Sequence, residues 1–353
     1  MKSFYNIHNF LKVAVIEENN DLTPGYDHYL RDFKADEEYE TVDYEVRKFS
    51  EFQLPESGLK ITDEFIGFDS GVYFPREKFA LTLNNNKICE YTAYANRATN
   101  LWLQVLLLKR GDSFLHGAGA EINGKGLIFP AFGGTGKTTL MSKLRKEKNF
   151  KFFGDDFVII DKNAKMHSYP SDFSIYDYHV KFFPEIRNTS FGRYLTMRKI
   201  FWPYYEGKRA VNFAAKRFLA GEPILNGWHA DYAKVPANFI VPSEQMGKQK
   251  DLFAGLFLSK YDGSEIKIEE MKLDELVGET AGILHLEFSG GLKYLYSLEA
   301  LGLFDMLEFE TTQKEILEKS FSKIKRYRIL VPRNINLDDY CDKVTRFINE
   351  ITA

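Results

Sequence analysis

The glycine-rich segment at residues 131–138, Ala-Phe-Gly-Gly-Thr-Gly-Lys-Thr, constrains this chain more than any other part of the sequence. Three glycines within four residues let the backbone curl until several N–H groups point inward, which suits the binding of phosphate oxygens. The segment matches the pattern GxxxxGK[ST], except that Ala131 stands where the first glycine is expected. An apolar run, Leu127–Phe129, precedes it and an amphipathic run, Thr138–Lys148, follows it. The order strand, loop, helix therefore predicts a nucleoside-triphosphate site.

Each polar position of this segment has a chemical task in that prediction. Lys137 places a positive charge on the terminal phosphates, and the Thr138 hydroxyl can bind magnesium. The helix that follows directs the positive end of its dipole at the same anion. ATP and Mg²⁺ are the expected cofactors, and the residues expected to bind the nucleotide are Gly133, Gly134, Thr135, Gly136, Lys137, Thr138 and Thr139.

Two neighbouring carboxylates follow the next expected strand. One of Asp155 and Asp156 can hold the metal while the other takes the proton of an attacking hydroxyl, and which does which is left open. Two like charges this close also raise the pKa of one carboxyl. Alone, the pair would fit a solvated acidic turn equally well. Behind a phosphate-binding loop, the catalytic interpretation is favoured.

His116 lies on an apolar run, Phe114–Ile122, that should pair with the strand leading into the glycine-rich segment. A single His in such a run is usually a packed core residue. The expected pairing would instead bring this imidazole near the two carboxylates, where it could orient one of them or bind a metal.

The remaining sequence predicts an α/β fold with a β-rich N-terminal module, residues 1–95, and a second domain, residues 96–353. In the first, we expect a hairpin of Val72–Leu83 and Lys87–Ala93; in the second, a helix over Asn96–Arg110 that ends at Gly111. Further along we expect strands at Asn238–Val241, Gly255–Ser259 and Glu265–Glu270, with Asp262-Gly263 as a hairpin turn between the last two. The expected helices are Leu276–Leu303, interrupted at Ser289-Gly290-Gly291, then Thr312–Ile324 and Leu337–Ile351.

Bulk composition excludes several functions. A formal net charge of −3 argues against a nucleic-acid partner, whose binding proteins are usually strongly basic. The longest apolar run, Leu101–Leu108, is too short to span a bilayer, so no membrane partner is expected. Cys89 and Cys341 are far apart and in no CxxC pattern, which argues against disulfide frameworks and cysteine-based zinc sites. With no signal-peptide pattern at the start, a cytoplasmic location is expected.

Residues 115–140, followed by Gly154-Asp155-Asp156, resemble the core of HPr kinase/phosphorylase and of the related ATP-dependent phosphoenolpyruvate carboxykinases. The resemblance implies a phosphate-loop core with a mixed sheet. It implies that His116 is an active-site His, that Lys137 and Thr138 bind phosphate and metal, and that the Asp pair binds metal and accepts a proton. It also implies that Glu185 aids the metal and that Arg187 contacts phosphate, although Asn188 stands where the family has glycine.

The resemblance implies a kinase that phosphorylates a serine-type hydroxyl in a protein, a peptide or a small metabolite. Two alternatives stay open: a nucleotide-binding regulator with little turnover, and a carboxykinase-like enzyme acting on a carboxylic acid. A homo-oligomer also stays open. The stretch at residues 193–217 is rich in basic and aromatic residues, and it is either solvated surface or a binding segment for phosphate or an acidic substrate. Within it, Arg198 and Arg209 are the best candidates for binding the substrate.

Overall fold

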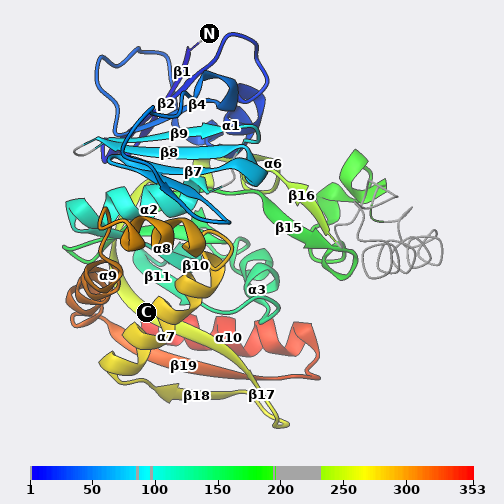
Figure 1. Ribbon diagram of the computed structural model, residues 1–353. Coiled ribbons are helices and arrows are strands. Elements are labelled where there is room, and N and C mark those ends of the chain that lie inside the picture. Colours follow the sequence, from blue (N-terminus) through cyan, green and yellow to red (C-terminus); the bar gives the residue numbers. More distant parts are fainter. Residues whose placement is uncertain (1, 85–86, 96–97, 194, 196–231) are drawn as a thin grey trace, which may run out of the picture.

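The computed structural model describes residues 2–84, 87–95, 98–193, 195 and 232–353. Two large mixed sheets and the helices packed on them confirm the α/β class. Figure 1 shows the N-terminal sheet above the central sheet, with helices α2 and α8 lying between the two. Within the described ranges, no helix is long and apolar enough to cross a membrane.

The N-terminal sheet has nine strands in the order β3-β1-β2-β4-β9-β8-β7-β6-β5. The strand β4 pairs in parallel with β2 and with β9, and the remaining neighbours are antiparallel. A short helix, α1 (Thr23–Tyr29), packs beside the sheet. The strands are β1 (Lys2–Ile7), β2 (Leu11–Ile16), β3 (Lys34–Ala35), β4 (Tyr44–Lys48), β5 (Lys60–Ile61), β6 (Ile66–Phe68), β7 (Gly71–Phe74), β8 (Phe79–Asn84) and β9 (Lys87–Thr92).

The central sheet follows the order β11-β10-β13-β14-β17-β19-β18, with β12 paired to β10. The long strand β17 pairs with β14 at its beginning and then in parallel with β11 and β19. A separate ribbon is formed by β15 (Phe173–Tyr176) and β16 (Tyr232–Val235). The central strands are β10 (Asp112–Ile122), β11 (Lys125–Pro130), β12 (Lys151–Gly154), β13 (Phe157–Asp161), β14 (Lys165–Tyr169), β17 (Gln249–Tyr261), β18 (Lys267–Glu270) and β19 (Lys325–Pro332).

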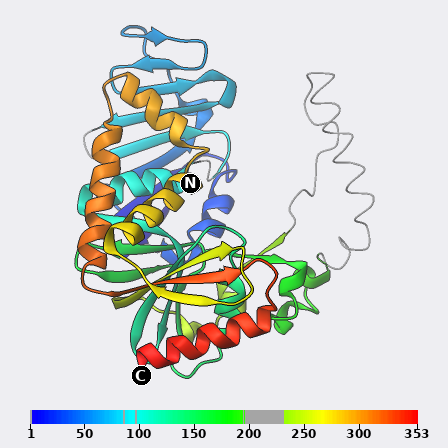
Figure 2. The ribbon, with the colours of Figure 1, turned by 90° about the horizontal axis from the view of Figure 1, so that it is seen from below.

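Helices fill the space between the sheets and cover the far side of the central sheet. Helix α10 lies on the side away from the N-terminal sheet in both views (Figures 1 and 2). The left-handed Gly111, at φ +82°, ends α2 as expected, and Gly291 separates α7 from α8 within the expected interruption. The helices are α2 (Thr99–Arg110), α3 (Lys137–Leu144), α6 (Ala237–Ile240), α7 (Leu273–Glu287), α8 (Leu292–Ala300), α9 (Met306–Phe321) and α10 (Leu337–Thr352).

Three sequence predictions are corrected here. The expected strand Val72–Leu83 is two strands, β7 and β8, because Pro75 begins a short 3₁₀ turn between them. The expected strand Asn238–Val241 is the short helix α6, which follows Pro236 at its N-cap. Asp262-Gly263 does not close a hairpin, because β19 inserts between β17 and β18 and pairs with both.

One apolar core joins the two sheets. It contains Val13 and Leu81 from the N-terminal sheet, Trp102 from α2, and Phe114 and Phe157 from the central sheet, all buried. In the same core, the ring of Phe79 stacks on that of Tyr294 in α8, with centroids 4.5 Å apart. Burying this surface stabilises the placement of the sheets relative to each other, because apolar area removed from water contributes roughly 25 cal/mol per Å².

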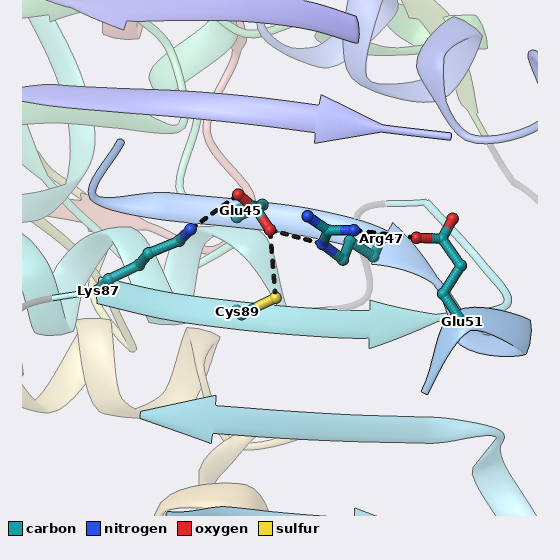
Figure 3. Close-up of polar contacts among 5 residues, drawn as sticks. All are labelled: Glu45, Arg47, Glu51, Lys87 and Cys89. Atoms are coloured by element: carbon teal, nitrogen blue, oxygen red, sulfur yellow. Dashed lines mark hydrogen bonds and ion pairs between the residues drawn. The ribbon is translucent and has the colours of Figure 1, made fainter. Parts of the chain in front are cut away.

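A polar network crosses β4 and β9 of the N-terminal sheet (Figure 3). The Glu45 carboxylate accepts hydrogen bonds from Lys87 Nζ at 2.8 Å and from Arg47 Nε at 2.6 Å, and Arg47 also contacts Glu51. The Cys89 thiol lies 3.8 Å from the same carboxylate. Burial, with the Glu45 charge, raises the pKa of Cys89 to about 11. This thiol therefore stays protonated near neutral pH and is a poor nucleophile.

Candidate active site

The glycine loop, residues 131–138, connects β11 to α3. Ala131 forms a parallel bridge with Leu258 of β17, which anchors the start of the loop. Gly134 and Gly136 have φ values of +75° and +100°, in the left-handed region that glycine adopts readily. A Cβ atom on Gly136 would also lie 3.0 Å from the ring of Tyr340 in α10. Gly136 is therefore required both by its own backbone and by its neighbour.

The N-terminus of α3 is open to an anion. Gly136 is the N-cap residue, and no described side chain caps this end of the helix. The N–H groups of the first helical turn are therefore free for a ligand, and the helix dipole adds positive potential at the same place. Gly133 and Gly134 are exposed, while Thr135 is buried, with its hydroxyl donating to the Phe132 carbonyl at 2.9 Å.

Lys137 reaches back along the loop rather than out to solvent. Its ammonium donates to the Ala131 carbonyl at 2.6 Å and lies 3.5 Å from the Phe132 carbonyl oxygen. Burial lowers the pKa of Lys137, and the nearby charges of Asp155 and Asp156 oppose that shift. The ammonium is thus held beside the loop, next to the two carboxylates. Thr139, by contrast, is buried and turned into the protein.

Thr138 and Asp155 form a direct contact across the site. The Thr138 hydroxyl donates to Asp155 Oδ2 at 2.8 Å, while Asp155 Oδ1 is buried and has no hydrogen-bond partner among the described residues. Burial, reinforced by Asp156, raises the pKa of Asp155 to about 7. A buried carboxyl with a spare oxygen, beside a hydroxyl, fits a hard cation such as magnesium, which would hold the carboxyl in its ionised form.

A large ligand cluster is not needed for that fit. Among the described residues, no group of three or more His, Cys, Asp and Glu could hold a metal ion. Magnesium at phosphate sites usually takes one or two protein ligands and completes its shell with water and phosphate oxygens. Thr138 and Asp155 would be those ligands.

Asp156 has a different environment from its neighbour. It is only partly buried, and its Oδ2 atom lies 3.8 Å from Lys234 Nζ of β16. The turn between β12 and β13 is tight: a Cβ atom on Gly154 would lie 2.0 Å from the Phe157 carbonyl oxygen. Glycine at this position thus allows both carboxylates to be presented at the end of β12.

His116 lies on β10, opposite Phe157 in the register with β13, and β10 pairs with β11 as expected. Its Nδ1 atom is buried without a hydrogen-bond partner among the described residues and lies 3.8 Å from Glu287 Oε2. Burial, with the charge of Lys137, lowers the pKa of His116 to about 3. The imidazole is therefore neutral near neutral pH.

Two residues at the site were missed by sequence reasoning, Glu287 and Lys234. Glu287 ends α7, two residues before the expected helix interruption, and burial together with Asp156 raises its pKa. The interruption was a usable signal, because the last residue of a helix before a glycine turn can face a neighbouring site. No comparable signal marks Lys234.

Glu185, a predicted metal ligand, lies at the other end of α3 from the glycine loop. Glu185 forms an ion pair with Arg145, which caps the C-terminal end of α3. That end is about 12 Å from Lys137, the length of an eight-residue helix. Arg187 follows the adjacent 3₁₀ turn, Pro184–Ile186. Arg198 and Arg209 lie outside the described residues.

The site thus combines a helix N-terminus with a lysine, a hydroxyl, two unlike carboxylates and a neutral imidazole. This combination can hold a chain of phosphates, bind a divalent cation and accept a proton. No protein-family model and no curated protein matched the chain when they were compared with it.

Proposed function

We propose that this protein is a phosphotransferase that uses ATP and magnesium to phosphorylate a hydroxyl group, with a core like that of HPr kinase. The observation that carries the proposal is the contact of Thr138 with Asp155 at the open N-terminus of α3, beside the Lys137 ammonium. Phosphoryl transfer depends mainly on positioning and charge neutralisation, and these groups supply both.

The transfer would be a single in-line displacement. The acceptor oxygen attacks the γ-phosphorus, and the bond from that phosphorus to the β–γ bridging oxygen breaks. ADP leaves with the electron pair of the broken bond, and the acceptor's hydroxyl proton passes to a carboxylate of the protein. The loop N–H groups and Lys137 hold the phosphates in place, and magnesium supplies additional neutralisation of their charge.

The different surroundings of the two aspartates support different roles. Asp155 is buried against Thr138 and has a spare oxygen, which suits metal binding. Asp156 is more open and faces Lys234, which suits proton acceptance from an incoming hydroxyl. Neutral His116 could accept or donate one hydrogen bond there, and an approaching triphosphate would raise its pKa.

Replacing Lys137 tests the nucleotide site. Lys137→Ala should lower ATP turnover by roughly 100-fold or more, because the buried ammonium beside the phosphates is lost. The matched control is Lys143→Ala on the same helix, where the lysine pairs with Asp342 at the surface and turnover should stay near wild type. Turnover is measured as ADP release, and wild-type turnover in Lys137→Ala would contradict the proposal.

A second variant separates a kinase from a regulator that only binds nucleotide. Asp156→Asn should abolish phosphoryl transfer yet keep ATP affinity within about threefold, because this carboxylate is assigned to the proton and not to the phosphates. Affinity is measured by titration calorimetry with magnesium and a non-hydrolysable ATP analogue. Transfer at the wild-type rate would exclude Asp156 as the base.

A further inference from the structure

A pocket of about 390 Å³ lies between the two sheets, next to the candidate active site. Its lining comes from β13, from α1 and the turn between β7 and β8, and from α2, α7, α8 and the segment that joins α7 to α8. We call it the intersheet pocket; six of its lining residues are Tyr29, Glu77, Asn100, Phe157, Glu287 and Lys293.

The inner end of the intersheet pocket adjoins the groups assigned to the chemistry. Phe157 directly follows Asp156 in the chain, and its ring lies 5.3 Å from that of His116. Glu287 lines the pocket and also approaches His116 Nδ1, at 3.8 Å. His116 itself is not a lining residue, so Phe157 and Glu287 are the residues that connect the pocket to the groups assigned to the chemistry.

Part of the lining is built by contacts between α8 and the turn that joins β7 to β8. Lys293 of α8 pairs with Glu77 of that turn, and the Tyr294 hydroxyl donates to the same carboxylate at 2.6 Å. Asn100, another lining residue, accepts a hydrogen bond from the Tyr169 hydroxyl at 2.9 Å. These contacts tie the pocket's shape to the packing of the N-terminal sheet on the rest of the chain.

The charges and hydrogen-bond donors of the lining determine which ligands the pocket would bind. With Lys293 paired to Glu77, Glu287 leaves an unbalanced negative charge among the described lining residues, and Asp156 lies close by. The first turns of α2 and α8 both line the pocket, and no described side chain caps either helix. In α8, the N–H groups of Leu292 and Tyr294 already donate to the carbonyls of Phe288 and Gly291. The first turn of α2 therefore supplies the N–H groups that are available to the oxygen atoms of a ligand.

We propose that the intersheet pocket binds the phosphate acceptor and that the acceptor is a small hydroxylated amine. Its ammonium would pair with Glu287, its hydroxyl would point toward Asp156 and His116, and its remaining oxygens would accept hydrogen bonds from the N-terminus of α2. The volume has room for roughly a dozen atoms of the size of water, which suits a metabolite. The assignment rests on the proposed kinase function.

Filling the pocket tests its role. A Cβ atom on Gly290, which lines the pocket, would meet no atom within 4 Å, and its φ is not left-handed, so Gly290→Phe should fold. Gly282→Phe is the matched control: it also has open space, on the exposed face of α7, and does not line the pocket.

The full-length protein is assayed for ADP release with a 1,2-amino alcohol and with the diol that replaces its amine by a hydroxyl. We expect Gly290→Phe to raise the KM for the amino alcohol by about tenfold or more while the affinity for ATP stays unchanged. Gly282→Phe should change neither quantity. In the wild type, the amino alcohol should have the higher kcat/KM.

Each failure has a distinct meaning. A wild type that does not bind ATP would overturn the proposed kinase function itself. ATP binding with an unchanged acceptor KM in Gly290→Phe would overturn the pocket assignment alone. Equal or better use of the diol, use of a serine peptide in place of the amine, or no turnover with the amine would overturn the acceptor class.

Discussion

Asp155, the proposed metal ligand, occupies a position where burial works against a negative charge. An isolated Asp loses its proton near pH 3.8, whereas the pKa of Asp155 in the folded chain is raised to about 7. The folded protein therefore keeps this proton over a pH range in which the unfolded chain has lost it. Functional groups often carry such a cost, because the environment that serves the ligand does not stabilise the empty fold.

The sign of this shift predicts how stability should depend on pH. Between about pH 4 and pH 7, the folded chain binds more protons at Asp155 than the unfolded chain, so the wild-type free energy of unfolding should fall as pH rises. Asp155→Asn replaces this carboxyl group with an amide that does not titrate. Near pH 8 and without metal, the variant should be more stable than wild type by roughly 1–3 kcal/mol.

Urea unfolding at several pH values measures this effect. The gain in stability from Asp155→Asn should be largest above pH 7 and vanish below about pH 3, where Asp155 is protonated in both the folded and the unfolded wild type. A difference that is independent of pH would show that Asp155 does not titrate abnormally. Saturating magnesium and ATP should reduce the stability difference between Asp155→Asn and the wild type, because they favour the ionised carboxylate that the variant lacks.

At the scale of single elements, the polar network on β4 and β9 affects the pKa of the Cys89 thiol. Glu45→Gln removes the negative charge beside Cys89 and leaves the cations Arg47 and Lys87 in place. The pKa of Cys89 should then fall, and the thiolate fraction at about pH 8 should rise by on the order of tenfold. Alkylation of Cys89, followed by peptide mass spectrometry, measures this.

Glu51→Gln is the matched control, since Glu51 contacts only the Arg47 end of the same network. Its Cys89 should react as slowly as in the wild type. Cys341 serves as an internal reference, because burial raises its pKa to about 12 and neither substitution is near it. Equal alkylation of Cys89 in all three proteins would show that Glu45 does not hold this thiol protonated.

Elements whose determinants are local could be predicted from the sequence. Gly111 predicts the end of helix α2, and the apolar run Phe114–Ile122 predicts the strand that pairs with β11. The position of β19 between β17 and β18 could not be, because pairing between distant segments leaves no trace in local spacing. The prediction of a strand at Asn238–Val241 was wrong for another reason: a run of four residues, three of them apolar, is too short to show a period.

In the candidate site, too, residues in local motifs could be predicted from the sequence, and residues brought in by tertiary packing could not. The glycine loop and the Asp pair are short contiguous motifs, so their residues could be named in advance, and Thr138 does contact Asp155. Glu287 and Lys234 reach the site only through the packing of α7 and β16. Glu185 was named from a three-residue match, and Arg145 pairs with it instead.

At the scale of the whole molecule, the shared core couples the two sheets. Val13 and Leu81 of the N-terminal sheet pack in the same cluster as Trp102 and Phe114. A fragment of residues 1–95 would expose that apolar face to water. We expect it to lack a cooperative thermal transition, whereas the full chain should unfold cooperatively. Circular dichroism during heating measures both, and a sharp transition in the fragment would show that the N-terminal sheet folds alone.

Glu77 and Tyr29 belong to the N-terminal sheet and its helix, whereas the glycine loop and the Asp pair lie more than 50 residues further along the chain. If the proposed kinase function holds, selection could therefore act on the acceptor pocket and on the nucleotide site separately. A descendant gene could exchange the lining contributed by its first hundred or so codons, and so acquire a new acceptor, while inheriting the proposed nucleotide site unchanged.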